Sequence, residues 1–267
     1  MSARSLCAVA CAAALAAVPS TAEAVPTYGT SLGSHSMLYL NHTAVQHEAL
    51  IRAASEAGLR YLRMDFAVGI VFAQDHPDFS AVDRVNALAF RYRVRVVGTI
   101  TDTPWHIAQC PAGQLAAPRT CAPSPQHERT WRHMVSEIVR RAPAIRHWEL
   151  GNEPDNAFGF AGTRADYARW ATLAAQGIRA VQPTATIIVG GFSRLDRGYI
   201  AAVLHDGVNP LIEQIDVANV HLRGRAGRMG AAVRRSRAST DRWDSEARCG
   251  SPRWATPRCL ATSTTQG

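Results

Sequence analysis

Short apolar runs rich in β-branched residues alternate with longer stretches of helical periodicity between residues 28 and 222. This alternation constrains the fold more than any other feature, because it is typical of βα units whose strands pair in parallel. The predicted strands are Tyr28–Leu32, Leu59–Asp65, Val94–Thr101, Ile145–Asn152, Thr186–Gly190 and Ile215–His221. The predicted helices are Ala44–Ala57, Ala81–Tyr92, Gln126–Arg141, Arg164–Val181 and Arg197–Asp206.

Polar residues stand at the end of the predicted strands, where a β/α barrel has the mouth of its active site. Examples are Arg63, Asn152 and His221. A doubly wound open sheet would produce the same alternation, but no glycine-rich phosphate-binding loop follows the first predicted strand. The sequence therefore predicts an α/β fold, a (β/α)8 TIM barrel, with about six βα units recognisable in residues 25–222.

The first 24 residues have the composition of a secretion signal. Arg4 precedes an apolar run over residues 6–18, and Ala-Glu-Ala at residues 22–24 fits a cleavage site. The apolar run is shorter than the ~20 residues needed to span a bilayer. A buried first helix is the alternative. We expect residues 1–24 to be a signal peptide and the mature chain to be secreted, with no membrane segment after cleavage.

Cys110 and Cys121 flank a loop that contains proline and glycine. An exported chain enters an oxidising compartment, so we expect these two cysteines to form a disulfide. A metal site is the weaker alternative, because no His or Cys pair at ligand spacing accompanies them. We therefore expect no bound metal.

The net charge of +8 is concentrated in the last 45 residues. Residues 223–267 contain ten Arg and three acidic residues, a balance of +7, whereas residues 1–222 contain 19 Arg and 18 acidic residues. A basic tail can bind nucleic acid. This tail has no aromatic residue besides Trp243 and Trp254, and an exported chain seldom meets intracellular nucleic acid. We expect no nucleic-acid partner.

The heptapeptide WELGNEP at residues 148–154 ends the fourth predicted strand. Glycoside hydrolysis usually needs two carboxylates, one to protonate the leaving oxygen and one to attack the anomeric carbon or activate water. A Glu at a strand end, followed by a Pro that stops ladder pairing, can project into a barrel mouth as that acid. The pattern resembles the clan A glycoside hydrolases, families 39 and 5 in particular, over residues 28–222.

The resemblance implies a retaining glycosidase that acts on an oligo- or polysaccharide without a cofactor, with Glu153 as its acid/base. Asn152 would then bind a sugar hydroxyl, Arg63 would hold the nucleophile carboxylate and His221 would lie near the acid/base. Glu149 would be a buried hydrogen-bonding residue below the site. Judged from the residues alone, Arg63 could instead form an ion pair with Asp65 at the surface, and His221 could be a histidine of the core.

Aromatic residues near the predicted mouth have two interpretations each. Trp105, just past the third strand, could stack on a sugar ring or anchor its loop. His106 beside it could be a solvated loop residue. Phe158 and Phe160 could line a sugar subsite or pin the loop that carries them.

Residues 223–267 do not continue the βα pattern. They contain no Ile, no Phe and one Val, and they lack the second Glu that clan A enzymes carry after strand seven within an apolar-Thr-Glu motif. Several codons can encode most of residues 248–257, so the shifted reading of this segment is not unique. If reading starts at the third base of the first codon, one permitted translation is Leu-Trp-Val-Thr-Glu-Met-Gly-Tyr-Pro. Only its Gly is the same for every choice of codons. We hypothesise a frameshift between residues 231 and 239. The alternative is an inactive carbohydrate-binding remnant or a pseudogene product.

Overall fold

The computed structural model describes residues 41–112 and 120–221, together with the backbone of strand 258–262. The predicted signal peptide and the predicted strand Tyr28–Leu32 lie outside the described residues. So does the greater part of the basic tail, residues 222–257.

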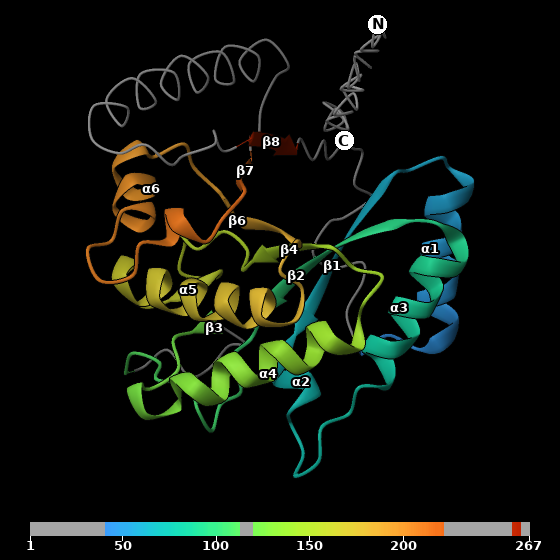
Figure 1. Cartoon of the computed structure of the whole chain (residues 1–267), viewed down its shortest axis with the longest axis horizontal. Helices are drawn as coiled ribbons and strands as arrows, with labels where there is room; N and C mark the ends of the chain where they lie inside the picture. Colours follow the sequence, from blue (N-terminus) through green and yellow to red (C-terminus); the bar gives the residue numbers. More distant parts are fainter. Residues whose placement is uncertain (1–40, 113–119, 222–257, 263–267) are drawn as a thin grey trace, which may run out of the picture.

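A parallel sheet forms the centre of the described chain (Figure 1). Its six strands are β1 (Tyr61–Ala67), β2 (Arg95–Thr101), β4 (His147–Leu150), β6 (Thr186–Phe192), β7 (Val217–His221) and β8 (Arg258–Thr262). The order across the sheet, β1-β2-β4-β6-β7-β8, is the order along the chain, and each neighbouring pair is parallel. A doubly wound sheet reverses its strand order at a switch point. The observed order is therefore that of a barrel wall.

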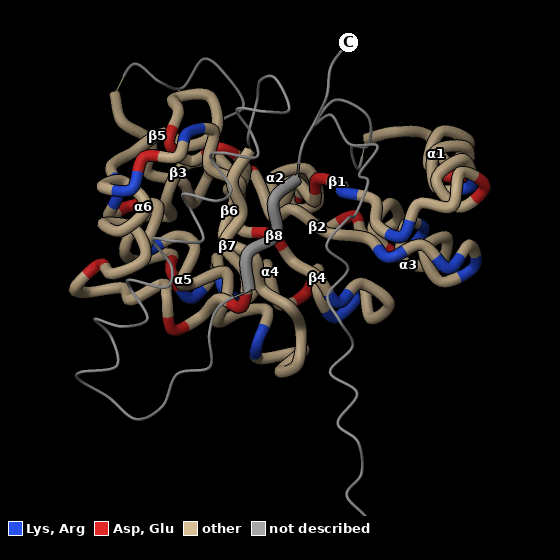
Figure 2. The backbone as a smooth tube through the Cα atoms, turned by 90° about the horizontal axis from the view of Figure 1, so that it is seen from above, with Lys and Arg blue, Asp and Glu red and all other residues tan. Residues whose placement is uncertain are grey.

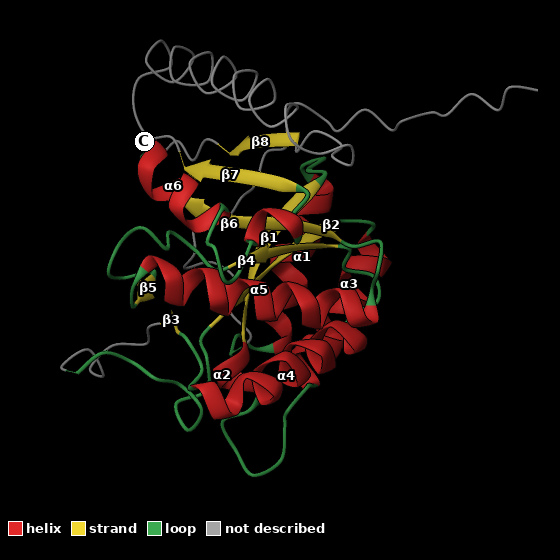
Figure 3. Cartoon of the chain, turned by 60° about the vertical axis from the view of Figure 1, so that its left-hand side comes forward, coloured by secondary structure: helices red, strands yellow, loops and turns green. Residues whose placement is uncertain are grey.

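Helices connect the strands from β1 to β7, and α4 and α5 pack together beneath the sheet in Figure 3. The helices are α1 (Ala44–Glu56), α2 (Val68–Val71), α3 (Ser80–Tyr92), α4 (Glu128–Arg141), α5 (Arg164–Val181) and α6 (Arg197–Leu204), with 3₁₀ turns η1 (Pro125–His127) and η2 (Leu211–Glu213). Within the described ranges, no helix combines the length and apolar character needed to cross a membrane.

The predicted helices, and the predicted strands that fall in the described residues, lie within two residues of the observed boundaries because local capping signals set their ends. Thr163 caps α5, since its Oγ1 accepts from the backbone N–H of Asp166 at 3.1 Å and the Asp166 carboxylate accepts from the N–H of Thr163 at 2.9 Å. At the end of α1, Gly58 adopts φ +69°. Leu59 N–H then bonds back to Ala54 O at 2.9 Å, which ends the helix.

Buried tryptophans fill the core below the strand ends. Trp148 of β4 packs over Gly98 of β2, where a Cβ would lie 2.6 Å from the indole ring. The Trp148 Nε1–H donates to Gln182 Oε1 at 3.2 Å, and the Trp170 Nε1–H donates to Thr103 Oγ1 at 2.8 Å. Because both indole donors are hydrogen-bonded, burial of these two side chains leaves no indole N–H unsatisfied.

The sequence predicts no strand after His221, and β8 corrects that expectation. Residues 258–262 pair in parallel with β7, from Val217 beside Arg258 to His221 beside Thr262. Without a neighbour, β7 would expose a row of backbone N–H and C=O groups, and such an edge pairs with any extended segment. Strand pairing needs only backbone groups, so a segment with little apolar character can supply the strand.

The predicted disulfide between Cys110 and Cys121 is present, with Cα atoms 5.3 Å apart. Cys121 belongs to a short strand, β3 (Thr120–Cys121), which pairs with β5 (Phe160–Ala161) in a separate two-stranded sheet. The disulfide therefore links the loop after β2 to a strand that supports the loop after β4.

Charged residues of both signs lie on the outer helices, as Figure 2 shows for α1 and α3. Arg91 lies 3.2 Å from Glu48, and Arg141 lies 2.5 Å from Asp83. Exposed pairs of this kind contribute about 0–1 kcal/mol each. The charges of the barrel are therefore interspersed, which agrees with the near-neutral balance of residues 1–222.

Candidate active site

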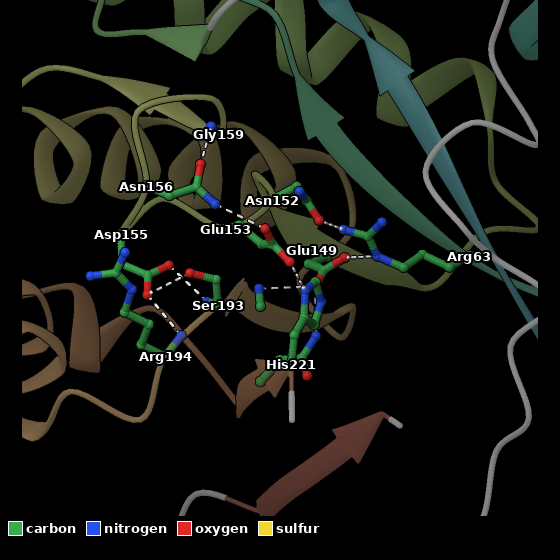
Figure 4. Close-up of polar contacts among 12 residues, drawn as sticks. Arg63, Glu149, Asn152, Glu153, Asp155, Asn156, Gly159, Ser193, Arg194 and His221 are labelled. Atoms are coloured by element: carbon green, nitrogen blue, oxygen red, sulfur yellow. Dashed lines mark hydrogen bonds and ion pairs between the residues drawn. The ribbon is translucent and has the colours of Figure 1, made fainter. Parts of the chain in front are cut away.

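Strand β1 and the carboxyl ends of β4 and β7 bring four residues that the sequence singled out into one cluster (Figure 4). Arg63 Nη2 donates to Asn152 Oδ1 at 2.9 Å, and His221 Nδ1 lies 2.9 Å from Glu153 Oε1. Parallel strands end at the same edge of a sheet, which explains why Asn152, Glu153 and His221 meet there. The sequence predicts Arg63 at a strand end too, but β1 continues to Ala67, so Arg63 lies within the strand and contacts Asn152 through its side chain. Trp105, the fifth predicted site residue, lies on the loop after β2.

Glu149 forms the floor of this cluster and is 1% exposed. Its Oε2 accepts from Arg63 Nε at 2.5 Å and from Thr99 Oγ1 at 2.9 Å, while its Oε1 accepts from Gly191 N–H at 3.2 Å and Asn219 Nδ2 at 2.7 Å. Both oxygens therefore have two donors, and the carboxylate is fully engaged.

These contacts decide the charge of Glu149. Burial by itself would raise the pKa of this carboxyl, but the charge and hydrogen bond of Arg63, the charge of His221 and the bond from Asn219 outweigh burial and hold the pKa below its ordinary value. Glu149 is thus an ionised structural residue at neutral pH. Arg63 also lies 3.6 Å from Asp65, but this pair is buried, with the Arg63 side chain 11% exposed, and is not at the surface.

Glu153 follows β4 in a backbone conformation that is unusual for a residue with a side chain. Its φ is +47°, and its N–H donates to Gly191 O at 3.0 Å. Left-handed backbone at a non-glycine residue costs on the order of 1–3 kcal/mol and is concentrated at functional sites. The conformation turns the carboxylate to His221 on one side and to Asn156 Nδ2, at 2.8 Å, on the other.

The loop after β4 is tied to the loop after β6 through Asp155. Its carboxylate accepts from the Ser193 N–H at 2.7 Å, from Ser193 Oγ at 3.0 Å and from the Arg194 N–H at 2.9 Å. Tyr199 Oη donates to Pro154 O at 2.8 Å from α6. Sequence reasoning missed Asp155 as a site residue. The signal was an Asx residue directly after Pro154 in the loop that follows β4, where such side chains commonly bind backbone N–H groups.

A second carboxyl with altered acidity lies at the end of β2. Burial, together with the negative charge of Asp65, raises the pKa of Asp102 to about 6. Its backbone has φ +52°, its N–H donates to Thr120 Oγ1 at 3.1 Å and its C=O accepts from Gly69 N–H at 2.7 Å. Perturbed carboxyls are common at active sites, so Asp102 is a further polar residue of the mouth.

The aromatic residues near the mouth separate into two kinds. Trp105 is 83% exposed and Phe158 is 82% exposed, so neither anchors its loop by burial and both can meet a ligand. Phe160 is 4% exposed and packs edge-on against Tyr167 and close to Trp170, with ring centroids 5.4 and 6.1 Å away. Phe160 therefore pins the loop.

Gly191→Ala is expected to displace the His221 ring, because a Cβ at residue 191 would lie 2.1 Å from His221 Nε2. Overpacking of this kind typically costs about 1–3 kcal/mol. Urea unfolding should show that loss, and the ¹⁵N NMR signals of the His221 ring should shift. Gly207→Ala is the matched control, since a Cβ there meets nothing within 4 Å. Unchanged His221 signals in Gly191→Ala would contradict this geometry.

Within the described residues, no group of three or more His, Cys, Asp or Glu side chains is arranged to hold a metal ion. The cluster is instead one of carboxylates, amides, a guanidinium and an imidazole. Such a set can bind hydroxyl groups and transfer protons.

No protein-family model and no curated protein matches the sequence. A family 39 glycoside hydrolase from the gut symbiont Bacteroides cellulosilyticus superposes with a TM-score of 0.51 and 17% identity, over 72% of this chain and 37% of that one. A GH30 endoxylanase from Clostridium papyrosolvens gives 0.52 and 14%, over 74% and 50%. The endo-1,4-beta-mannanase from Rhizomucor miehei gives 0.50 and 13%, over 73% and 66%.

The described residues have the fold of part of the TIM barrel that these glycoside hydrolases share. The predicted fold class is therefore confirmed, and so is the resemblance to clan A glycoside hydrolases at the level of the fold. The chain spans between 37% and 66% of the length of these three structures. Glu153 and His221 lie at the carboxyl ends of β4 and β7, the end of the strands where TIM barrels carry their active-site loops.

Proposed function

We propose that the chain is an exported glycoside hydrolase in which Glu153 is the general acid/base and the substrate is an oligo- or polysaccharide. The observation that carries this proposal is the placement of the Glu153 carboxylate, in a strained backbone conformation after β4, 2.9 Å from His221 Nδ1. Export is supported by the composition of residues 1–24 and by the disulfide between Cys110 and Cys121.

In the proposed reaction Glu153 begins protonated and gives its proton to the glycosidic oxygen, while a second carboxylate bonds to the anomeric carbon and the glycosidic bond breaks. Glu153 then takes a proton from the water that displaces this carboxylate from the sugar, which restores the starting state. His221 orients the carboxyl group from β7. Asn152 accepts from Arg63 through Oδ1, which determines that the Nδ2 end of its amide is the donor toward a sugar hydroxyl.

The second carboxylate of a retaining mechanism is proposed to be encoded out of frame. Glu149 is unsuited to the role, because it is buried and both of its oxygens are already engaged. The codons allowed for residues 248–257 permit a Val-Thr-Glu-Met-Gly segment in the shifted frame, and Trp254 followed by Ala255 forces its Gly. The proposal rests on that coding argument and on the composition of residues 223–267.

The test compares the chain as printed with a chain in which one base is moved between codons 231 and 239 and the new frame is read to its stop codon. Both are assayed on aryl glycosides of glucose, xylose, mannose and galactose. We expect hydrolysis by the frame-restored chain and none by the printed chain. Turnover by the printed chain that disappears with Glu246→Gln would show that the tail supplies the nucleophile and would overturn the frameshift. An inactive frame-restored chain would count against the glycosidase.

A second candidate function is carbohydrate binding without hydrolysis. The exposed rings of Trp105 and Phe158 favour it, because aromatic faces bury apolar area against a ligand and need no nucleophile. Calorimetric titration of the printed chain with oligosaccharides distinguishes this candidate. Binding that weakens in both Trp105→Ala and Phe158→Ala, with no turnover in either frame, would support it.

A further inference from the structure

The second oxygen of Glu153 is held by a residue of its own loop. Asn156 Nδ2 donates to Glu153 Oε2 at 2.8 Å (Figure 4). The other end of the same amide, Oδ1, accepts from the backbone N–H groups of Phe158 and Gly159, both at 2.9 Å. Only the oxygen of an amide can accept these bonds. The two backbone donors therefore determine that the NH₂ group of Asn156 faces Glu153.

The loop that carries Asn156 has little room to move. The Asn156 N–H donates to Glu153 O at 3.1 Å. A Cβ on Gly159 would lie 2.1 Å from Asn152 O and 2.2 Å from Glu153 O, so the loop folds directly onto the backbone before it. Asp155 ties the same loop to Ser193. The amide donor is thus presented to Glu153 by a segment anchored at several points.

We propose that Asn156 is a positioning residue that holds the Glu153 carboxylate from Oε2 and sets the pH at which Glu153 exchanges its proton. A hydrogen bond donated to a carboxylate favours its ionised form. The titratable and charged groups that face Glu153 are His221 from β7 and Arg63 from β1, with Glu149 below on β4. Asn156 acts beside them from the loop and carries no charge of its own. The catalytic consequence rests on the proposed function, whereas the contact does not.

Asn156→Asp separates this role from a purely structural one. An aspartate oxygen still accepts from Phe158 and Gly159, so the loop keeps its anchor, but the donor that faces Glu153 Oε2 becomes a second carboxylate oxygen. Like charges disfavour ionisation. We expect the protonation midpoint of Glu153 to rise by about one pH unit or more. The midpoint is measured by ¹³C NMR of carboxyl-labelled Glu in the full printed chain, with the Glu153 signal identified by its loss in Glu153→Gln.

Asn86→Asp is the matched control, because Asn86 Oδ1 also accepts from a backbone N–H, that of Ala144, at 2.8 Å. The contact between Asn86 and Ala144 lies before the amino end of β4, whereas Glu153 lies beyond its carboxyl end. Asn86→Asp adds the same charge as Asn156→Asp. A midpoint in Asn156→Asp no higher than in Asn86→Asp would overturn the proposal. If Asn156→Asp fails to fold, Asn156→Ala removes the donor without adding charge. It should give a smaller rise, and an unchanged midpoint there would overturn the proposal equally.

The NMR readout does not depend on turnover, so the two proposals fail separately. In the frame-restored chain the alkaline limb of the kcat/KM profile should move upward with the midpoint, since the acid must be protonated to act. A raised midpoint without glycosidase activity would sustain the role of Asn156 and remove the proposed function. Glycosidase activity with an unchanged protonation midpoint of Glu153 would support the proposed function and remove the role of Asn156.

Discussion

Glu153→Gln is expected to lower kcat of the frame-restored chain by about 10²–10⁴-fold on glycosides with poor leaving groups. Glutamine has nearly the shape of glutamate but cannot give a proton to the glycosidic oxygen. For a glycoside whose leaving group departs without protonation, kcat should fall much less. The ratio of the two losses, measured on an unactivated disaccharide and on a nitrophenyl glycoside of the same sugar, therefore identifies proton donation as the missing step.

Glu213→Gln is the matched control for this experiment. Glu213 is exposed in η2, ahead of the amino end of β7, and the chemical change is identical. Its rates should equal those of the parent chain. Parent-like hydrolysis of the disaccharide by Glu153→Gln would remove Glu153 from the acid/base role, whatever the fold resembles.

Arg63→Met is expected to lower the free energy of unfolding by about 3–5 kcal/mol at neutral pH, because it leaves the buried charge of Glu149 without its cation. The Arg63 side chain is 11% exposed and that of Glu149 is 1% exposed, so solvent cannot take the place of the guanidinium. Urea unfolding followed by circular dichroism measures the loss. A variant as stable as the parent would show that the pair does not hold the strand ends together.

The same variant should change how stability depends on pH. In the parent the folded-state pKa of Glu149 lies below its ordinary value. Its ionised form therefore adds stability above about pH 4.3, the ordinary value for Glu, and this is lost as the pH falls through the folded pKa. Without Arg63, burial raises the pKa of Glu149. Protonation of Glu149 at low pH then removes the free-energy cost of a buried charge that has no cation beside it. The deficit of Arg63→Met should thus shrink as the pH is lowered.

The double variant Arg63→Met/Glu149→Leu checks the cause. Replacing both members of a buried ion pair by apolar side chains is often close to neutral, whereas removing one member is not. We expect the double variant to be more stable than Arg63→Met alone at neutral pH. A double variant that is no more stable would mean that Arg63 contributes mainly through Asn152 or through packing.

The described strands and helices could be predicted closely because periodicity and capping are local properties. The helix of residues 164–181 was predicted with its observed ends, since Thr163 and Asp166 cap it. Glu153 could be found for the same reason, because a strand end followed by Asn-Glu-Pro is a contiguous pattern. Asn156 lies only three residues from Glu153, so an Asx turn could have been expected there, although the partner of its amide could not.

The sequence by itself determined the order of the βα units, the strand that Glu153 follows and the pairing of Cys110 with Cys121, because each depends on residues close together in the chain. Only the tertiary structure decided which polar groups meet at the strand ends. The donors to Glu149 come from 86, 50, 42 and 70 residues away, in Arg63, Thr99, Gly191 and Asn219. Strand register aligns them, and the acidity of Glu149 follows from burial and from the charges of Arg63 on β1 and His221 on β7, which no local pattern encodes.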